Sequence, residues 1–251
     1  MPRTTLQDAV VLVAGGAKNL GALIARQAAE AGADVAIHHH DEASRAEAED
    51  TLRAVEAAGR RGVLLSGDLT VPEACTSLFA DAEAALGRVD VAVNTVGKVL
   101  RKPIAETDED EYDAMFDINA KAAFFFLKEA GRRVADGGAV ITLVTSLLAA
   151  FTDGYATYAG GKAPVEHFTR AAAKELAERG ISVTAVAPGP MDTPFFYPQE
   201  TPERVEFHKS QAMGNQLTRI EDIAPIVRFL ATEGWWITGQ TIFANGGYTT
   251  R

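Results

Sequence analysis

The chain has 251 residues, which suffice for one α/β domain or for two small ones, so length alone does not decide between them. Hydrophobic residues make up 47% and charged residues 23% of the sequence, a globular balance that excludes a disordered chain. The formal net charge of −10 argues against nucleic acid or an anionic membrane as a partner.

No run of about 18 or more apolar residues predicts a transmembrane helix. The segment from Met1 to Asp8 lacks the charged and then apolar order of a signal peptide. We therefore expect a cytoplasmic protein. The lone Cys75 excludes an intrachain disulfide, and its place on the apolar stripe of a predicted helix indicates packing.

Seven apolar, β-rich runs alternate with segments of helical spacing along the whole chain. Several of these runs are apolar throughout, as expected of parallel strands that are covered on both faces. The helix after Thr70 has the clearest pattern, and Thr70 with Glu73 predicts a capping box at its start. Expected strands are Val10–Ala14, Val35–His38, Gly62–Ser66, Asp90–Asn94, Ala139–Val144, Ile181–Val186 and Gln240–Ala244. Expected helices cover 19–31, 42–58, 71–86, 108–134, 157–179 and 220–232, with Gly32, Gly59 and Gly180 as C-terminal stops.

This alternation predicts an α/β fold, a single-domain Rossmann-type doubly wound parallel sheet with helices on both faces. No linker divides residues 1–251. The segment 188–217 has no clear periodicity and is rich in Pro, aromatic residues and Gln. A long segment of this kind in a compact domain is usually functional, so we interpret it as a substrate lid.

A glycine-containing turn joins the first strand to the first helix, which is the context of a dinucleotide-binding loop. A helix N-terminus attracts a pyrophosphate, and glycines let the backbone approach it. A tight turn without a ligand is the alternative explanation. The residues expected to bind the cofactor here are Gly15, Ala17, Lys18, Asn19, Leu20 and Gly21.

The second strand ends in three histidines before Asp41, where NAD use would favour an acid for the ribose 2′-hydroxyl. This favours NADP(H), although NAD is not excluded. Adjacent strand residues point to opposite faces, so three consecutive histidines make a poor chelate and we expect no metal. The candidates to meet a 2′-phosphate are Lys18, His39 and His40, the preceding His38, and Ser44 or Arg45.

The next two strand ends carry further candidates for the nucleotide. Asp68 and Leu69 follow the third strand, where a carboxylate could accept from the adenine amino group or cap an ordinary turn. The fourth strand ends at Asn94–Gly97, whose Val96 and Gly97 would let the backbone run beside the ribose.

The fifth strand is followed by Thr145 and Ser146, and the next helix carries Tyr158 and Lys162 on one face. An ammonium beside a phenol stabilises the phenolate, so we expect Lys162 to lower the pKa of Tyr158. Tyr158 would then act as a general acid for a carbonyl that accepts hydride. Tyr155 has Ala159 at the same spacing and lacks such a partner.

Together these residues resemble the short-chain dehydrogenase/reductase family over nearly the whole chain, and the sequence is similar to its 3-oxoacyl carrier-protein reductase-like members. The motifs are Gly15–Gly21, Asp68, Asn94–Gly97, Asn119, Ser146, Tyr158, Lys162, Pro188-Gly189 with Thr193, and Trp236–Gln240 with Gly246-Gly247.

The resemblance implies a role for each matching residue. Ser146 would hydrogen-bond the substrate oxygen, Tyr158 would donate the proton, and Lys162 would lower its pKa and hold the ribose. Asn119 would fix a water for proton relay, and Thr193 would contact the nicotinamide amide, with Pro188 and Gly189 beside it. The resemblance also implies a homotetramer, or a dimer, built through the last strand and helix pairs.

Several departures from the family pattern are visible. Ala14 and Asn19 stand where the family prefers Thr and Gly, and Asn tolerates the required backbone better than most residues. The family's Asn-Asn-Ala-Gly is Asn94-Thr95-Val96-Gly97. Ser146 precedes Tyr158 by twelve residues where the family has thirteen, which keeps Thr145 in reserve as the orienting hydroxyl. Pro164 predicts a local helix bend.

The rival function is a non-catalytic NADP-binding regulator, but a sensor would not need Asn119, Ser146, Tyr158 and Lys162 together. An epimerase or dehydratase on this fold would need a larger C-terminal part. The lid residues Met191, Phe195, Phe196, Tyr197, Phe207 and Met213 indicate an apolar or aromatic ketone or simple packing. Lys98, Arg101 and Lys102 form a solvated loop or steer an anionic substrate or an acidic carrier protein.

Overall fold

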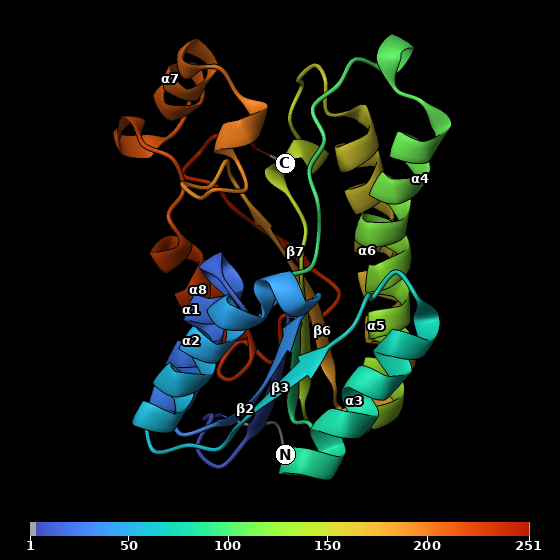
Figure 1. Ribbon diagram of the computed structural model, residues 1–251, viewed down its shortest axis with the longest axis vertical. Helices are drawn as coiled ribbons and strands as arrows, with labels where there is room; N and C mark the ends of the chain where they lie inside the picture. The colour runs from blue at the N-terminus through green and yellow to red at the C-terminus, as the bar shows by residue number, and fades with distance from the viewer. Residues whose placement is uncertain (1–3, 251) are drawn as a thin grey trace.

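A computed structural model describes residues 4–250 as a seven-stranded parallel sheet with helices on both faces (Figure 1). The strand order is β3-β2-β1-β4-β5-β6-β7, so the order reverses between β1 and β4. Ligands bind at such a switch point, beyond the carboxyl ends of the strands. The strands are β1 Val10–Ala14, β2 Asp34–His39, β3 Gly62–Ser66, β4 Val91–Asn94, β5 Ala139–Leu143, β6 Ser182–Pro188 and β7 Thr241–Ala244. The predicted fold class is confirmed.

Two helical layers bury the sheet, which explains why the inner strands are apolar throughout. Side chains of α1 Asn19–Glu30, α2 Arg45–Ala57 and α8 Ile220–Leu230 pack on one face. The other face is covered by α3 Pro72–Leu86, α5 Ala122–Arg133 and α6 Ala156–Glu175, with α4 Glu109–Phe116 packed against α6 (Figure 1). Cys75 is buried in the second layer, and burial raises the pKa of its thiol to about 12, as befits a packing residue.

Two local predictions differ from the structure. The capping box at Thr70 is wrong: α3 begins at Pro72, and Thr70 instead donates to Asp68 Oδ1 in the preceding turn. The predicted helix 108–134 is divided by a π-helical turn at Asp117–Lys121, which contains Asn119. A π turn widens the helix locally and often marks a functional position.

The helix α6 continues through Pro164, and the bend predicted there stays a prediction. Gly32, Gly59 and Gly180 all have positive φ where helices end, as predicted. Among residues 4–250, no helix is both long and apolar enough to cross a bilayer.

The segment 188–217 contains a helix that the sequence analysis did not predict. This helix, α7 Pro202–Ser210, lies above the carboxyl ends of the strands (Figure 1). Its signal was a cap: Thr201 accepts from the Arg204 N–H, and Pro202 occupies the first helical position. Only Val205 and His208 are buried, so no apolar stripe marks the helix.

Candidate active site

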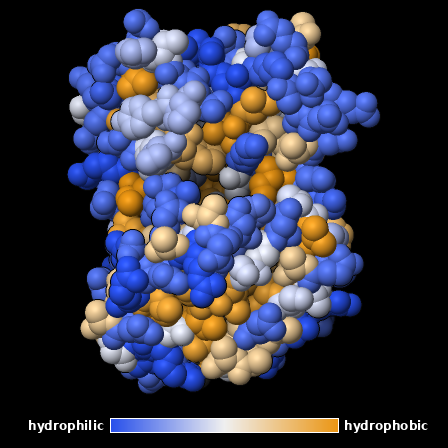
Figure 2. Space-filling view, viewed as in Figure 1, coloured by the Kyte–Doolittle hydropathy of each residue, from blue (hydrophilic) through white to orange (hydrophobic). Residues whose placement is uncertain are grey.

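Two adjoining hollows open at the carboxyl ends of the strands. A cleft of about 650 Å³ runs from the glycine loop to α6, and a pocket of about 80 Å³ lies beneath α7. Figure 2 shows a hollow bordered by apolar residues on this face of the molecule. Tyr158 and Thr193 line both hollows, so they stand where the contents of the two would meet.

The glycine loop has the backbone that a phosphate-binding turn requires. Gly15 has φ +77°, and a side chain at Gly21 would place its Cβ 2.1 Å from the Gly15 carbonyl oxygen. Asn19 adopts φ 49°, so it accepts the left-handed geometry that the family gives to glycine. The first turn of α1 carries no acidic residue, which leaves its positive end available to an anion.

A buried histidine holds this loop in place. The Gly15 N–H donates to His38 Nδ1 at 3.1 Å, so Nε2 carries the proton and donates to the Gly67 carbonyl at 2.9 Å. The ring is therefore a neutral brace between β2, the glycine loop and the end of β3. Burial lowers the pKa of His38 to about 4.

This shift predicts a pH dependence of stability. The native pKa of about 4 lies below the ordinary 6.5, so the unfolded chain binds more protons between these values. The contribution of His38 to the free energy of unfolding is fully present above pH 6.5. It is lost as the pH falls to 4, by about 3 kcal/mol. Urea unfolding at several pH values checks this. A His38→Gln variant should lose that part of the slope, whereas the exposed His40→Gln should retain it. Equal slopes in both would contradict the assignment.

At the far end of the cleft, Lys18, His39, His40 and Ser44 line the predicted 2′-phosphate region, as does Asp41. The Lys18 ammonium is 3.1 Å from Glu47, and both side chains are about half exposed. Arg45 does not line the cleft, because Glu42 and Glu49 engage its guanidinium.

The three histidines diverge: His38 faces the glycine loop, His39 Nδ1 lies 2.9 Å from the Asp41 carbonyl oxygen, and His40 is exposed. Within residues 4–250 no cluster of metal ligands forms.

The remaining predicted cofactor residues divide into two groups. Leu69, Val96 and Gly97 line the cleft. Asp68 and Asn94 do not, because their Oδ1 atoms accept from the backbone N–H groups of Thr70 and Val96, respectively. These two side chains shape the turns at the strand ends.

Of the residues expected beside the nicotinamide, Pro188 and Thr193 line the cleft, while Gly189 lines the adjoining pocket. The Thr193 hydroxyl is buried and has no hydrogen-bond partner among the described residues. A buried unsatisfied hydroxyl that faces a cleft fits a ligand with its own hydrogen-bonding group. The glycine loop at one end and this hydroxyl at the other suit a dinucleotide.

Tyr158 and Lys162 are brought together on α6, and both are buried. The Lys162 Nζ donates to the carbonyl oxygens of Val96 at 3.1 Å and Leu143 at 3.0 Å. Burial raises the pKa of Tyr158 to about 12 and lowers that of Lys162 to about 8. The expectation that Lys162 lowers the phenol pKa is wrong for the chain by itself, since burial dominates and only a Thr145 hydrogen bond opposes it.

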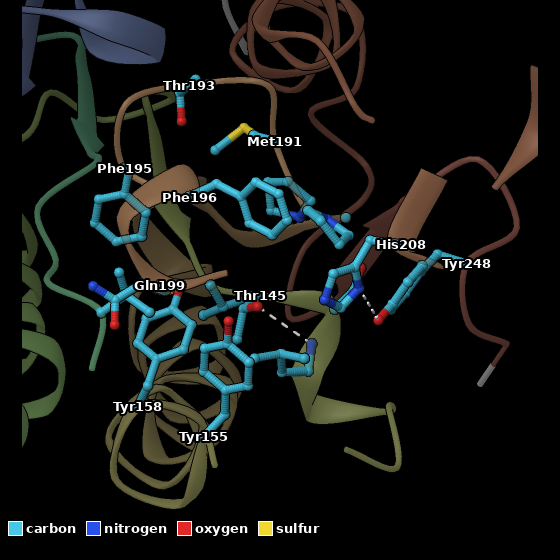
Figure 3. A pocket seen from close by; sticks show the side chains of 17 residues that line it. Thr145, Tyr155, Tyr158, Met191, Thr193, Phe195, Phe196, Gln199, His208 and Tyr248 are labelled. Atoms are coloured by element: carbon cyan, nitrogen blue, oxygen red, sulfur yellow. Dashed lines mark hydrogen bonds between the residues drawn. The ribbon is translucent and has the colours of Figure 1, made fainter. Parts of the chain in front are cut away.

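Thr145 and Ser146 both line the pocket with Tyr158, and of the two it is the Thr145 hydroxyl that acts on the pKa of Tyr158. The Ser146 hydroxyl donates to the Ala187 carbonyl at 3.0 Å and accepts from Asn245 Nδ2 at 3.1 Å. Its proton is therefore already engaged within the protein. Thr145 lines the pocket and its Oγ1 accepts from the Leu147 N–H at 3.2 Å (Figure 3), while its hydroxyl lowers the pKa of Tyr158 against the larger effect of burial. It precedes Tyr158 by thirteen residues, the family's spacing, which was the signal that favoured it.

Asn119 is fully buried in the π turn, and its side chain holds the loop after β4. Nδ2 donates to the carbonyl oxygens of Lys98 at 2.8 Å and Met115 at 3.0 Å, while Oδ1 accepts from the Lys98 N–H. The side chain positions the loop that contacts Lys162.

The walls of the pocket are largely apolar. Of the lid residues expected to meet the substrate, Met191, Phe195 and Phe196 line the pocket (Figure 3). Tyr197, Phe207 and Met213 do not and are exposed. Arg101 pairs with Asp153 and Lys102 with Glu111, so neither contributes an unpaired positive charge that would steer an anion.

A buried polar network behind the pocket was missed by the sequence analysis. The Glu200 side chain is fully buried and accepts from the Tyr155 hydroxyl, from His208 Nε2 at 3.0 Å and from Arg204 Nε at 3.0 Å. His208 Nδ1 lies 2.9 Å from the Tyr248 hydroxyl. Tyr155, His208 and Tyr248 line the pocket. No sequence motif joins these residues, since they come from separate elements.

Comparison with known proteins places the chain in a family. The sequence profile described as Enoyl-(Acyl carrier protein) reductase matches residues 15–249. A short-chain type dehydrogenase/reductase of Picea abies is 34% identical over 247 residues, covering 95% of this chain and 91% of the relative. An Arabidopsis thaliana protein named NADPH-dependent aldehyde reductase-like protein, chloroplastic, is 34% identical over 260 residues. The match covers 98% of this chain and 96% of the relative.

A solved structure supports the same placement. The crystal structure of a dehydrogenase from Burkholderia cenocepacia with bound NADP superposes with a TM-score of 0.97 at 59% identity, covering 100% of this chain and 97% of that one. Sequence, fold and the Tyr158–Lys162 site therefore agree, and the chain belongs to the short-chain dehydrogenase/reductase family.

Proposed function

We propose that this protein is an NADP(H)-dependent oxidoreductase that transfers hydride between the cofactor and a ketone or secondary alcohol. The observation that carries the proposal is the position of Tyr158, a buried phenol at the junction of the nucleotide cleft and the apolar pocket. A proton donor at that junction meets a carbonyl held in the pocket.

NADP(H) is favoured over NAD by the residues at the ribose end of the cleft. Lys18 and His40 can meet a 2′-phosphate there, and Ser44 lies beside them. The glycine loop would hold the pyrophosphate, Lys162 the nicotinamide ribose, and Thr193 the amide. The bound cofactor would supply the hydride. The neighbour with bound NADP and the relative named for NADPH support the same choice.

The chain's own part in the reaction is proton delivery and orientation. Tyr158 would donate its proton to the carbonyl oxygen, and the Thr145 hydroxyl would hydrogen-bond the same oxygen. Lys162 would hold its positive charge close to the phenol. Because the Asn119 side chain is engaged with the loop, a relay water would bind a backbone carbonyl in the π turn.

The segment 188–217 would act as the lid of the substrate pocket. Met191, Phe195 and Phe196 form part of the pocket wall, and the Gln199 Oε1 accepts from the Arg101 N–H at 2.9 Å. Such anchors would let the segment close over a substrate and exclude water.

Assembly into a homotetramer, or a dimer, is supported by apolar side chains on two faces. Trp236 is 83% exposed in the turn before the edge strand β7, and Phe229 on α8 and Phe124 on α5 are each about half exposed. Exposed aromatic groups of this kind mark association surfaces. The acidic net charge and the single buried Cys75 suit the cytoplasm.

The proposal is tested by the loss of reduced-nicotinamide absorbance with NADPH and NADH in parallel. The carbonyl panel would contain β-ketoacyl esters, diketones, quinones and cyclic ketones. We expect turnover with NADPH to exceed turnover with NADH. Tight nucleotide binding without turnover of any compound would indicate a non-catalytic NADP-binding regulator instead.

Replacing each hydroxyl in turn distinguishes Thr145 from Ser146. Thr145→Val should lower kcat/KM by about 10²-fold or more, because the substrate oxygen loses one hydrogen-bond donor. Ser146→Ala should act mainly on stability, by about 1 kcal/mol, since the Ala187 carbonyl loses the hydroxyl donor and Asn245 Nδ2 keeps only its Thr249 acceptors. Steady-state kinetics and urea unfolding separate the two effects. A larger kinetic loss in Ser146→Ala would reverse the assignment.

A further inference from the structure

The turn that follows β7 contains the Asn245-Gly246-Gly247 sequence, which the proposed hydride transfer leaves without a role. Gly246 and Gly247 have φ values of 61° and 83°, so the backbone reverses here in a conformation that favours glycine. The Tyr248 N–H donates to the Asn245 carbonyl at 3.1 Å and closes the turn. The geometry of this turn decides where the side chains of residues 245–249 lie.

The buried Asn245 side chain is the centre of a hydrogen-bond network. Its Oδ1 accepts from the Gly247 N–H at 3.0 Å, and its Nδ2 donates to the Thr249 carbonyl at 3.2 Å. A backbone N–H only donates and a backbone carbonyl only accepts, so these two bonds fix the orientation of the amide. Nδ2 also donates to the Ser146 hydroxyl at 3.1 Å, which in turn donates to the Ala187 carbonyl. All these groups are uncharged, so the bond directions do not depend on pH.

Asn245 thereby joins the turn to two strand ends at the substrate pocket. Ser146 follows β5 and lines the pocket, while Ala187 lies in β6 one residue before that strand ends. The turn is also tied to the segment 188–217, because its backbone accepts from the Met213 N–H at 2.8 Å. The position of the turn relative to the pocket is therefore set mainly by side-chain and backbone groups that face Asn245 and its neighbours.

The side chain that this turn places in the pocket is Tyr248. Figure 3 shows its ring beside His208, on the side of the pocket away from Phe195. The centroids of the Tyr248 and His208 rings are 5.8 Å apart, and the Tyr248 hydroxyl lies 2.9 Å from His208 Nδ1. Tyr248 lines the pocket but not the nucleotide cleft. Its ring therefore limits the space for the substrate and leaves the space for the cofactor unchanged.

We infer that Asn245 is a positioning residue and Tyr248 a specificity-determining residue of the active site: Asn245 holds the turn after β7 against the ends of β5 and β6, and Tyr248 then closes one wall of the substrate pocket. This inference rests on the proposed function and narrows its substrate class to compact carbonyl compounds. The pocket of about 80 Å³ is smaller than the dry cavity of about 150 Å³ that holds benzene in another protein. A bulky group remote from the reacting carbonyl would meet the Tyr248 ring.

The test compares cyclohexanone with 4-tert-butylcyclohexanone, which present the same carbonyl and differ in one bulky group remote from it. The wild type should have the higher kcat/KM for cyclohexanone. Tyr248→Ala should raise the relative kcat/KM of the bulky ketone by about tenfold or more, because the wall opens by the size of a ring. Asn245→Leu, which keeps the approximate shape but no hydrogen bond, should shift the ratio in the same direction. The double variant should shift it little further, because both changes open the same wall.

Two readouts separate positioning from a purely structural role. The KM for NADPH should stay unchanged in these variants, since neither residue lines the nucleotide cleft. The matched control Tyr112→Ala removes a half-exposed ring on α4 that lines neither hollow, and it should keep the wild-type ratio. An Asn245→Leu protein that loses turnover of both ketones equally and binds NADPH more weakly would overturn the positioning role. Tyr248→Ala keeps the Asn245 bonds and carries the test if Asn245→Leu does not fold.

Binding gives a measurement that needs no turnover. Dissociation constants of the two ketones would be measured by saturation-transfer NMR on the Tyr158→Phe protein loaded with NADP⁺, with and without Tyr248→Ala. A shift of their ratio towards the bulky ketone in Tyr248→Ala supports the inference even if neither ketone is reduced, a result that would refute only the proposed function. The same ratio with and without Tyr248→Ala overturns the inference.

Discussion

Replacing Tyr158 with phenylalanine is expected to lower kcat for carbonyl reduction by about 10²–10⁴-fold, the usual contribution of a general acid. The phenol is buried at the junction of the cleft and the pocket, with the Thr145 hydroxyl beside it. Burial raises the pKa of Tyr158 to about 12, which keeps the proton on the phenol at neutral pH and suits donation to a developing alkoxide. NADPH consumption under single-turnover conditions measures this loss.

The matched control for this variant is Tyr112→Phe on α4, since Tyr112 is half-exposed, stacks on Phe116 and lines neither hollow. It should retain wild-type kcat. NADPH affinity should remain in both variants, because the phosphate-binding loop lies at the other end of the cleft. A Tyr158→Phe protein with undiminished kcat would place the proton donor elsewhere.

The second large effect is expected at Glu200, where replacement by alanine should lower the free energy of unfolding by about 3–5 kcal/mol. The carboxylate is fully buried and serves Tyr155, His208 and Arg204 at once. Its removal leaves the partly buried Arg204 and Arg101 with only the exposed Asp153 as a counterion. Urea unfolding of the wild type and the variant measures the change.

Glu206→Ala on the neighbouring helix α7 is the control for this measurement. Its side chain is 71% exposed and pairs only with Lys209, so its loss should cost less than about 1 kcal/mol. Glu200→Gln should fall between the two, because it keeps hydrogen-bonding groups but removes the charge. A Glu200→Ala protein as stable as Glu206→Ala would show that the network does not stabilise the fold around α7.

Much of the fold could be predicted because the signals are local. An apolar run such as Val10–Ala14 must be covered on both faces, and the turn from Gly15 to Gly21 depends on backbone geometry that a few adjacent residues decide. The helix α7 gave a weak signal because only Val205 and His208 are buried. The Thr70 capping box failed for a local reason as well, since Asp68 offered the Thr70 side chain a competing turn.

The sequence by itself determined where the site's parts lie along the chain. These are the glycine loop after β1, Tyr158 and Lys162 one helical turn apart, and a long segment after β6. Each follows from spacing along the chain. Which hydroxyl faces Tyr158 was decided by the tertiary structure, because Ser146 is drawn inward by Ala187 on the neighbouring strand β6. Burial likewise decided the pKa values of Tyr158 and Lys162. The polar network joins Tyr155 to Glu200 and His208 to Tyr248 across 45 and 40 residues, separations at which only the folded chain brings side chains into contact.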